Sequence, residues 1–453
     1  MSTSSIHAKY GDKVLTVEPY GVETVEGADR HGSAKGQFPL WLGSNLTIAD
    51  YALGFLPISL GMSWGFTIAS ILIGNLVGAI VLALCAAMGP SYGEPQLMIG
   101  RFTFGRVGGY LPAVLNYLST IGWFTVNNIL GAFGLKVLFP SLSFWQGAVI
   151  LVIIQSLLAI YGHNLIHLYE RIMSVVLGVM FVIVTAIALS HHATLAAYHA
   201  TTHAPWAMFG IMVGAAFSYI GSWGPYASDY SRYLPKSTKR KSIISYSFWG
   251  AFIASVWLEL VGAAVAILAG AHPGNPISAI HSVAGAFGTL SVIAIILGGT
   301  AADALNLYSN SLSAGAMGLK LPRWLLALMA SIIGLILSLL GSGSFESNYE
   351  SFLLLLGYWM TPWVGVLFAD FYIQKAYKWA SSDKRNLKSI QLPGLASFLI
   401  GIVISTLFMS SELYEGPIAK AMNGVDLAFY VGFLVSFIIY LLWNKPSKAD
   451  KKA

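Results

Sequence analysis

The chain has 453 residues, of which 56% are hydrophobic and only 10% are charged, whereas a soluble domain carries about a quarter charged residues. This composition, with a mean hydropathy of +0.70, excludes an ordinary soluble protein and predicts a polytopic membrane protein. The formal net charge of +6 can indicate nucleic-acid binding, but the placement of the basic residues gives a membrane explanation instead. The single cysteine, Cys85, excludes an intramolecular disulfide.

Twelve stretches of the chain are long and apolar enough to be membrane spans, since a hydrocarbon core about 30 Å thick needs about 20 apolar residues per helix. We predict spans at 39–61, 64–87, 109–138, 144–161, 166–189, 206–226, 243–269, 287–316, 324–340, 351–372, 392–409 and 425–443. Residues 1–37 are polar and lack the apolar core of a signal peptide, so we expect a soluble cytoplasmic N-terminal tail there. The loops are short, and no second soluble domain is expected.

The basic residues predict the topology of these spans. With the N-terminus placed in the cytoplasm, 23 of the 25 Lys and Arg residues fall on the cytoplasmic side, and only Lys136 and Lys420 fall outside. This asymmetry follows the positive-inside rule and indicates an even number of spans with both termini cytoplasmic. No GxxxxGK[ST] nucleotide-binding loop occurs, so direct drive by ATP is not expected.

Spans 1 and 6 are predicted to be interrupted. Span 1 carries Gly43, Ser44, Asn45, Asp50 and Gly54 in its middle, and span 6 carries Gly210, Gly214, Gly221, Gly224 and Pro225. These spans begin two five-span halves, 38–190 and 205–374, which are followed by spans 11 and 12 in 391–443 and a cytoplasmic tail, 444–453. Interrupted helices at matching positions of two repeats point to a transporter binding site, because unwound backbone can contact a ligand at mid-membrane. Glycine packing between helices is the alternative.

Three acidic residues lie inside apolar spans: Asp50 in span 1, Glu259 in span 7 and Asp303 in span 8. A carboxylate at the bilayer centre costs roughly 2.5–3.5 kcal/mol on insertion scales, so such residues usually face a polar cavity and handle ions or substrate. A hydrogen-bonded structural acid is the alternative for each, and Glu259 can equally carry a proton or bond to a neighbouring helix. Together the three favour a transport pathway.

Trp123 and Asn127 lie four residues apart in GWFTVNN of span 3, and therefore on one helical face. An indole beside a carboxamide suits a flat heteroaromatic ligand, since the ring stacks on the indole and the amide bonds to the ring edge. A tryptophan in a membrane protein is more often an interfacial or packing residue. Trp123, however, lies mid-span, where an interfacial residue would not lie.

Span 6 places Tyr219 and Trp223 beside its glycines. Asp229 and Arg232 follow at the predicted cytoplasmic end of the span, where we favour a solvated ion pair that anchors the helix end. Four irregularly spaced histidines in the outside loop after span 5 are expected to be exposed loop residues rather than metal ligands: His191, His192, His199 and His203.

Span 8 contains GGTAADALNLYSNSL, in which Thr300, Asp303 and Asn306 are spaced at i, i+3 and i+6. They roughly share one face of the helix, and that face would be expensive against lipid. We therefore expect it to point into the protein, toward the same pathway.

At these residues the chain resembles the nucleobase–cation symporter family 1, the purine–cytosine permeases. The likeness covers nearly the whole chain and includes GPSYGEPQLMIGRFTFGRVGGYLPAVLNYLSTIGWF, WGPYASDYSRYLPKS, LNLYS and FLLLLGYWMTPWVGVLFADFY. The resemblance implies an all-α integral membrane protein of 12 transmembrane helices with the leucine-transporter-like fold. Ten core helices would form a 5+5 inverted repeat, and two extra C-terminal helices would follow.

The resemblance also implies the substrate site. The span 3 tryptophan that stacks on the base matches Trp123, and the amide one turn later in some members matches Asn127. The second aromatic wall falls at Tyr219 or Trp223, and the alignment through the glycines does not decide between them. The span 8 asparagine that bonds to the heterocycle edge matches Asn306.

For the coupling cation, sodium-dependent members bind the ion between span 1 carbonyls, here around Ser44 to Ile48, and two adjacent hydroxyl residues of span 8. Thr300 matches the first of these hydroxyl residues, but Ala301 lacks the second oxygen. This departure puts sodium in doubt. Asp50 and Asp303, with Glu259 as a further candidate, can complete a cation site or carry a proton, and we favour the proton.

The sequence thus predicts a secondary active importer in the cell membrane for a nucleobase, cytosine or a purine first, coupled to H⁺ or Na⁺, with no cofactor. A related heterocycle (allantoin, a hydantoin, uracil or thiamine) is the alternative substrate. Two other classes remain: an intramembrane enzyme that uses Asp50 and Asp303 as a carboxylate pair, and a passive channel or sensor. The expected partners are the substrate, the coupling cation and the lipid bilayer, and no nucleic-acid partner is expected.

Overall fold

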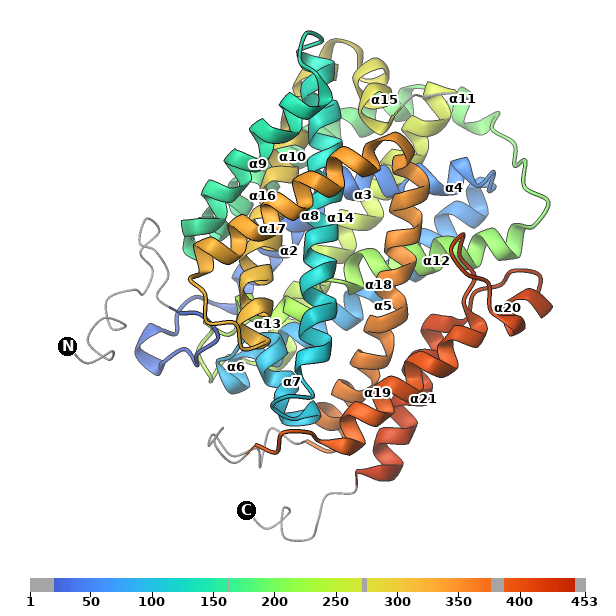
Figure 1. Cartoon of the computed structure of the whole chain (residues 1–453). Helices are drawn as coiled ribbons and strands as arrows, with labels where there is room; N and C mark the ends of the chain where they lie inside the picture. The colour runs from blue at the N-terminus through green and yellow to red at the C-terminus, as the bar shows by residue number, and fades with distance from the viewer. Residues whose placement is uncertain (1–19, 162, 271–274, 376–386, 445–453) are drawn as a thin grey trace.

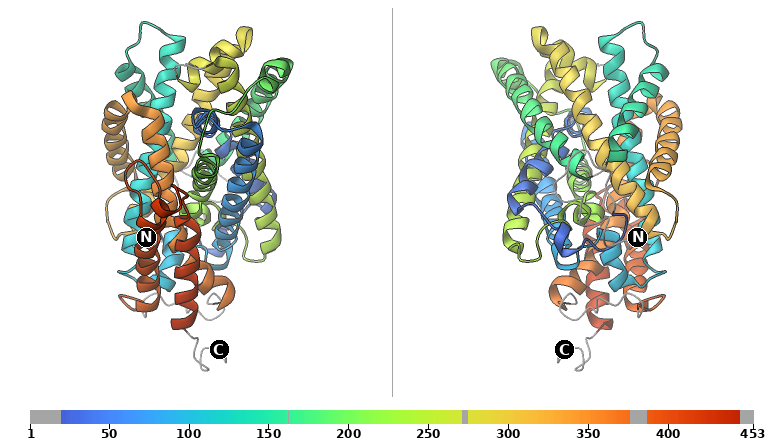
Figure 2. Two further views of the ribbon diagram at one scale, coloured as in Figure 1. Left: turned by 90° about the vertical axis from the view of Figure 1, so that its right-hand side faces the viewer. Right: turned by 90° about the vertical axis from the view of Figure 1, so that its left-hand side faces the viewer.

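The computed structural model describes residues 20–161, 163–270, 275–375 and 387–444. Within these ranges the regular structure is helical, apart from one isolated bridge between Ser410 and Glu415. Most of the long helices run roughly side by side, so that the molecule is a bundle of helices crossing it from one end to the other (Figures 1 and 2).

Spans predicted to be unbroken coincide with long helices. These are α5 (Trp64–Ala86), α8 (Tyr110–Leu138), α9 (Phe144–Tyr161), α10 (His163–Ser190), α14 (Arg240–Ala269), α16 (Gly288–Ala316), α17 (Arg323–Gly341), α18 (Phe345–Phe368), α19 (Leu392–Ser405) and α21 (Ala428–Trp443). Among the described residues, seven helical segments are long and apolar enough to cross a membrane on their own, and α17 and α18 count as one of them. Four further apolar helices are shorter.

The connections between these helices contain short helical pieces. They are α6 (Gly89–Tyr92), α7 (Gln96–Phe104), α11 (His192–Ala196), α15 (Pro276–Val283), α20 (Pro417–Ala421), the 3₁₀ turns η1 (Gly27–Asp29), η2 (Ala34–Gly36), η4 (Gly285–Phe287), η5 (Ser342–Ser344) and η9 (Thr406–Phe408), and the π-helical turn η6 (Ala369–Ile373). The turn η6 continues α18 to the end of the predicted span 10.

Span 1 is interrupted, as the sequence predicts. It consists of α2 (Gln37–Asn45), α3 (Ile48–Leu53) and α4 (Leu56–Ser59). The backbone leaves the helical conformation at Leu46, with ψ of 62°, and is extended at Thr47. The Thr47 hydroxyl then accepts a hydrogen bond from the Asp50 backbone N–H at 3.4 Å and so caps α3. Peptide groups of the break are therefore available to other partners at the depth of the membrane.

Span 6 is interrupted as well. The helix α12 (Pro205–Gly221) ends at the predicted glycine, and it is followed by the 3₁₀ turn η3 (Gly224–Tyr226) and by α13 (Ala227–Ser231). Pro225, inside η3, has no backbone N–H to donate, so an α-helical ladder cannot continue through this point.

The outer half of span 1 packs directly on α14. A Cβ built on Gly54 would lie 2.1 Å from the Glu259 carbonyl oxygen, and one built on Gly262 would lie 2.1 Å from the Tyr51 carbonyl oxygen. Each glycine therefore makes room for the backbone of the other helix, and no larger residue fits at either position without a shift. Gly54 therefore serves in packing between helices, which is the alternative role given for the glycines of spans 1 and 6.

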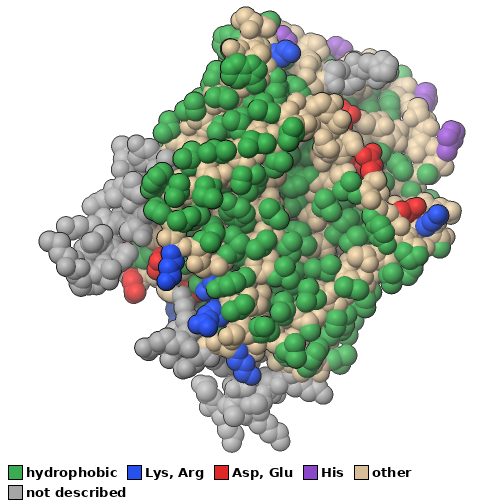
Figure 3. All heavy atoms as spheres, viewed as in Figure 1, with side chains coloured by type: hydrophobic (Ala, Val, Ile, Leu, Met, Phe, Trp, Pro, Cys, Tyr) green, Lys and Arg blue, Asp and Glu red, His purple; other side chains and the backbone are tan. Residues whose placement is uncertain are grey.

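The surface is that of a membrane protein. Hydrophobic side chains cover the middle of the face drawn in Figure 3, and Lys and Arg side chains gather mainly toward its lower left edge, around α7. Large apolar side chains point outward from several helices, among them Leu118, Leu157, Val175 and Val403. Apolar exposure on this scale is expected where lipid, not water, is the solvent.

Candidate functional site

Trp123 of α8 lies against the break of span 6. Its indole nitrogen donates a hydrogen bond to Ser222 Oγ at 3.0 Å, and its ring meets the ring of Tyr219 edge-on, with centroids 5.1 Å apart. Phe352 of α18 closes a third side, with centroids 5.2 Å apart. The side chain is only 5% exposed, so Trp123 is not a membrane-interface residue but part of an aromatic cluster between α8, α12 and α18.

Asn127 and Asn306 meet at the carboxyl group of Asp303. Asn127 Nδ2 donates to Asp303 Oδ1 at 3.0 Å, and Asn306 Nδ2 donates to the same oxygen at 3.4 Å. Asp303 Oδ1 accepts both hydrogen bonds, so both amides turn their NH₂ groups toward it. Asp303 thereby fixes the orientation of the two amides that the sequence assigns to the substrate edge.

The amide oxygens consequently point away from Asp303. Asn306 Oδ1 accepts a long hydrogen bond of 3.4 Å from the Tyr226 hydroxyl. Asn127 Oδ1 is buried and has no hydrogen-bond partner among the described residues. A buried acceptor without a partner costs roughly 1–3 kcal/mol, so this oxygen is suited to a ligand that supplies an N–H group.

Tyr219 stands almost perpendicular to Trp123, with 87° between the ring planes. Its hydroxyl shares a hydrogen bond of 2.9 Å with Thr47 at the break of span 1. A flat ligand held between two aromatic walls needs those walls nearly parallel and separated by the thickness of a ring. Because Tyr219 already touches Trp123 edge-on, no ring fits between these two side chains.

Trp223 takes a different position. Its indole nitrogen donates to Asn45 Oδ1 at 3.1 Å, and its ring packs against Tyr226 and Trp41, with centroids 5.3 and 5.7 Å away. Tyr226 in turn bonds to Asn306. Trp223 therefore lies on the far side of the break from Tyr219, joined to the amide cluster through Tyr226 and to span 1 through Asn45.

The residues predicted to surround a sodium ion lie where α16 meets the break of span 1. A Cβ on Gly298 would be 3.1 Å from the Leu46 carbonyl oxygen, and a Cβ on Gly299 would be 3.4 Å from the Ile48 side chain. The predicted hydroxyl group of Thr300 donates to Ile296 O at 2.8 Å within its own helix, and the Ser44 hydroxyl likewise donates to Leu40 O at 2.7 Å.

Asp50 faces α14 rather than α16. Its polar side-chain neighbours are Ser255 and Glu259, and Glu259 also neighbours Asn75 of α5. All four residues have no exposed surface. The carboxyl oxygens of Asp50 and Glu259 have no hydrogen-bond partner within 3.5 Å among the described residues. The result is a fully buried cluster of two carboxyl groups, one hydroxyl and one amide between spans 1, 2 and 7.

The two span carboxyls that we considered as a pair, Asp50 and Asp303, therefore have separate surroundings. Asp303 is bonded to Asn127 and Asn306, while Asp50 faces Glu259. The carboxyl group next to Asp50 belongs to Glu259 of span 7, and no spacing in the sequence indicates this pairing.

Asp229 and Arg232 are not solvated, so the expectation of a solvated ion pair is wrong. Arg232 has no exposed surface and Asp229 is 3% exposed. Asp229 accepts from the backbone N–H of Gln96 at 2.9 Å, and Arg232 donates to Gly21 O at 2.8 Å and to Tyr308 Oη at 3.1 Å. The reason is that the segment before span 1 folds back over Arg232, while the start of α7 lies against Asp229.

This N-terminal segment, residues 20–36, is held by several further contacts. Tyr20 donates to Asp29 at 2.5 Å, and Arg30 donates to Pro90 O at 2.7 Å. Burial, and then the hydrogen bond to Asp29, raise the pKa of the Tyr20 hydroxyl. The prediction of a soluble tail to residue 37 thus covers a part, residues 20–36, that packs on the helix bundle.

Sequence reasoning missed Tyr226 and Glu170. Tyr226 lies in the GPY of η3, where the glycine and proline drew attention to the backbone rather than to the phenol. Glu170 of α10 is fully buried, and a Cβ on Gly43 would lie 2.5 Å from its Oε2. In the sequence it stands beside Arg171 and looks like the polar end of a span. The four loop histidines are exposed as expected, and the described residues contain no group of three or more metal-ligating side chains.

Comparison with known proteins places this geometry in context. A family model described as permease for cytosine/purines, uracil, thiamine and allantoin matches residues 24–432. The chain is 29% identical over 452 residues to YxlA of Bacillus subtilis, whose name assigns it to the purine-cytosine permeases, and the match covers 95% of this chain and 97% of that protein. It is 25% identical to the purine-cytosine permease fcyB of Emericella nidulans, over 94% of this chain and 88% of that protein.

Among solved structures, the chain is similar to Mhp1, a nucleobase-cation-symport-1 family transporter solved in a closed conformation with bromovinylhydantoin bound. The TM-score is 0.75 at 17% identity, and the match covers 96% of this chain and 98% of Mhp1. A sodium-coupled sialic acid symporter matches with a TM-score of 0.63 at 12% identity, over 98% of this chain and 96% of that structure. At these identities the likeness shows the fold, and the predicted multi-span helical fold of a leucine-transporter-like symporter is confirmed.

Proposed function

This chain belongs to the family of permeases for cytosine/purines, uracil, thiamine and allantoin, the nucleobase–cation symporters, and on that premise we propose that it imports a nucleobase, cytosine or a purine first, by proton symport. As a member of a transporter family it is not an enzyme, so the intramembrane enzyme that the sequence left open is set aside. We place it in the cell membrane with both termini in the cytoplasm, in line with the basic residues.

The observation that carries the proposal is the pair of amides oriented by Asp303. Asn127 Oδ1 is a buried acceptor without a partner in the described part of the chain, one helical turn from Trp123 on the same face. A nucleobase combines a flat aromatic ring with N–H groups on its edge, and it would satisfy both groups at once. A ligand in which the ring N–H is replaced by N–CH₃ would leave the acceptor unpaired, so such analogues should compete poorly.

Trp223 is the second aromatic wall in this proposal, and Tyr219 is not. Tyr219 meets Trp123 edge-on at 87°, whereas Trp223 lies on the other side of the break, next to Tyr226. In this arrangement a base stacks between Trp123 and Trp223, its edge toward Asn127 and Asn306. Asn45 fixes the indole of Trp223 from span 1, which links the substrate site to the broken helix.

The coupling ion that we propose is the proton. At the junction of span 1 and α16, Thr300 offers one hydroxyl group, and Ala301 has no side-chain oxygen, so the oxygen shell that sodium prefers is incomplete. Glu259, with Asp50 facing it, is the proposed carrier. One monovalent cation moving down 100 mV gains about 2.3 kcal/mol, which supports roughly 50-fold accumulation of a neutral solute.

A competition panel in intact cells tests the proposal. Uptake of radiolabelled cytosine and hypoxanthine is measured against excess unlabelled adenine, uracil, allantoin, hydantoin, thiamine and N-methylated bases, with and without sodium and with a protonophore. We expect nucleobases with free N–H edges to compete, N-methylated bases to fail, and the protonophore but not sodium removal to abolish accumulation. Equal uptake with and without the protonophore in proteoliposomes would indicate a passive channel.

A further inference from the structure

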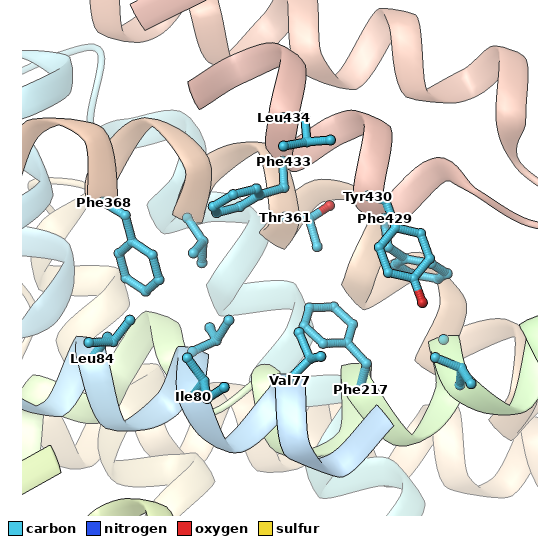
Figure 4. A pocket seen from close by; sticks show the side chains of 14 residues that line it. Val77, Ile80, Leu84, Phe217, Thr361, Phe368, Phe429, Tyr430, Phe433 and Leu434 are labelled. Atoms are coloured by element: carbon cyan, nitrogen blue, oxygen red, sulfur yellow. The ribbon is translucent and has the colours of Figure 1, made fainter. Parts of the chain in front are cut away.

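A groove on the outside of the bundle lies between α5, α12, α18 and α21, and it has a volume of about 360 Å³ (Figure 4). Its lining is apolar except for the hydroxyl groups of Thr361 and Tyr430. The Thr361 hydroxyl is already bonded to Gly357 O at 2.9 Å within α18. The groove thus offers almost nothing to a polar ligand.

Aromatic side chains lie at both ends of the groove. At one end, Tyr372 packs on Phe368 with centroids 5.6 Å apart, and its hydroxyl donates to Leu84 O at 2.6 Å, which joins α18 to α5. At the other end Phe429 contacts Phe217 with centroids 5.9 Å apart. Figure 4 shows Phe368 and Leu84 at one end, Phe429 and Tyr430 at the other, and the space between them.

The groove therefore opens sideways. Its rim consists of Ile80 on α5 and Tyr430 and Leu434 on α21, which are 43%, 45% and 52% exposed. These helices are apolar and belong to the predicted spans, so the opening faces the hydrocarbon of the bilayer rather than water. An apolar cavity that excludes water binds apolar matter of matching shape, and a hydrocarbon chain of the bilayer is the apolar matter that reaches a groove opening toward lipid. We propose that the groove is a binding site for one acyl chain of a membrane phospholipid.

Such a chain would lie against α12, the first part of the interrupted span 6. One wall of the groove is formed by Val213, Gly214 and Phe217 of α12, directly before Tyr219 and the break of span 6. The opposite wall is formed by α18 and α21. A bound chain sets the spacing between these walls, and it would therefore favour one arrangement of α12 over another.

Photo-crosslinking tests this proposal independently of transport. The purified full-length protein is reconstituted in phosphatidylcholine vesicles containing a phosphatidylcholine with a diazirine in its acyl chain. Adducts are then mapped by mass spectrometry after illumination. We expect adducts to be concentrated on residues 77–84 and 429–434, above the level on other exposed apolar residues.

Two isoleucines of α5 provide a matched comparison, since Ile73 and Ile80 are both 43% exposed and lie seven residues apart on one face, and only Ile80 lines the groove. In Ile80→Trp, adducts on 429–434 should fall about fivefold or more, because the indole occupies the space that the chain needs. In Ile73→Trp they should stay at the wild-type level. Should Ile80→Trp fail to fold, Leu434→Trp with Leu442→Trp as its control gives the same comparison on residues 77–84.

Two results would overturn the proposal. Adducts spread evenly over all lipid-facing helices would mean that the groove has only the lipid contact of any membrane surface. A lack of adducts on residues 77–84 and 429–434, with a doubled mass in detergent, would assign the groove to a dimer interface instead.

Discussion

Arg232 donates a hydrogen bond of 3.1 Å to the phenol oxygen of Tyr308, and so joins the end of span 6 to α16. The same guanidinium donates to the backbone oxygens of Gly21 at 2.8 Å and Glu23 at 3.4 Å. One buried side chain therefore holds together the two spans that carry the candidate substrate site and the segment that precedes span 1.

We predict that Arg232→Gln loosens this junction. The shorter neutral side chain cannot reach all of these oxygens, and each buried acceptor left without a partner costs roughly 1–3 kcal/mol. The melting temperature in detergent should fall, and proteolysis N-terminal to residue 37 should become faster. Arg106→Gln, at an exposed arginine, serves as control and should change stability by about 0.5 kcal/mol at most. Equal melting temperatures for the two variants would contradict the prediction.

The two aromatic candidates of span 6 can be separated by truncation. Trp223→Ala should raise the KM for the transported base roughly 5- to 150-fold, the equivalent of about 1–3 kcal/mol of stacking. Tyr219→Ala should raise it less, because Tyr219 meets Trp123 edge-on and does not face a ligand stacked on that indole. Trp249→Ala, at a half-exposed residue of α14, should leave KM unchanged. The reverse order of the first two effects would assign the wall to Tyr219.

Asp303→Asn tests the orientation of the amides. An asparagine at 303 can donate as well as accept, so Asn127 and Asn306 are no longer forced to turn their oxygens toward the substrate. We expect KM to rise about tenfold, which corresponds to about one hydrogen bond, and discrimination against N-methylated bases to weaken. Direct binding measured by calorimetry should show the same loss. Unchanged discrimination would show that Asn127 Oδ1 is not the group that detects the N–H.

Removing the carboxyl of Glu259 should leave movement of the base intact but uncouple it from the proton gradient. We expect Glu259→Gln to exchange labelled for unlabelled base across proteoliposome membranes but to lose accumulation driven by a pH gradient. Glu170→Gln is a matched control, since Glu170 is also fully buried and its carboxyl oxygens also lack hydrogen bonds among the described residues, but it lies on α10. Loss of accumulation in both variants, or in neither, would contradict a specific role for Glu259.

A glycine substitution tests the close contact between span 1 and α14. Gly54→Ala would place a Cβ 2.1 Å from the Glu259 carbonyl oxygen, and we expect it to lower stability by about 1–3 kcal/mol, the usual cost of overpacking. In Gly178→Ala of α10 the new Cβ meets nothing within 4 Å, and helix propensity should raise stability by up to about 1 kcal/mol. Thermal unfolding in detergent measures both.

Much of this architecture follows from the sequence, because local signals in a membrane are strong. Apolar length sets each span, and glycines with polar neighbours mark the breaks at Leu46 and at Ser222, where the structure has them. Helical spacing also put Asp303 and Asn306 on one face of span 8, and the two side chains are hydrogen-bonded in the structure. The bond from Asn127 of span 3 to Asp303 was not predicted.

Contacts between distant segments could not be predicted from the sequence. The proximity of Asp50 to Glu259 depends on how α3 packs on α14. The glycines at 54 and 262 allow this close packing, but their presence in the sequence does not predict it. The burial of Arg232 depends on residues 20–36 folding back over the bundle. A charged residue near a helix end looks solvated in the sequence, and only the tertiary structure shows what covers it.

The contact of Gly54 and Gly262 has a mechanical consequence. Because the two backbones meet without intervening side chains, we expect α3 and α14 to move together. Bending between α2 and α3 is then expected at Leu46 and Thr47, where the backbone leaves the helical conformation. A rotation at Leu46 and Thr47 would move Asn45 and Thr47 in opposite directions. The indole of Trp223, bonded to Asn45, and the phenol of Tyr219, bonded to Thr47, would move with them.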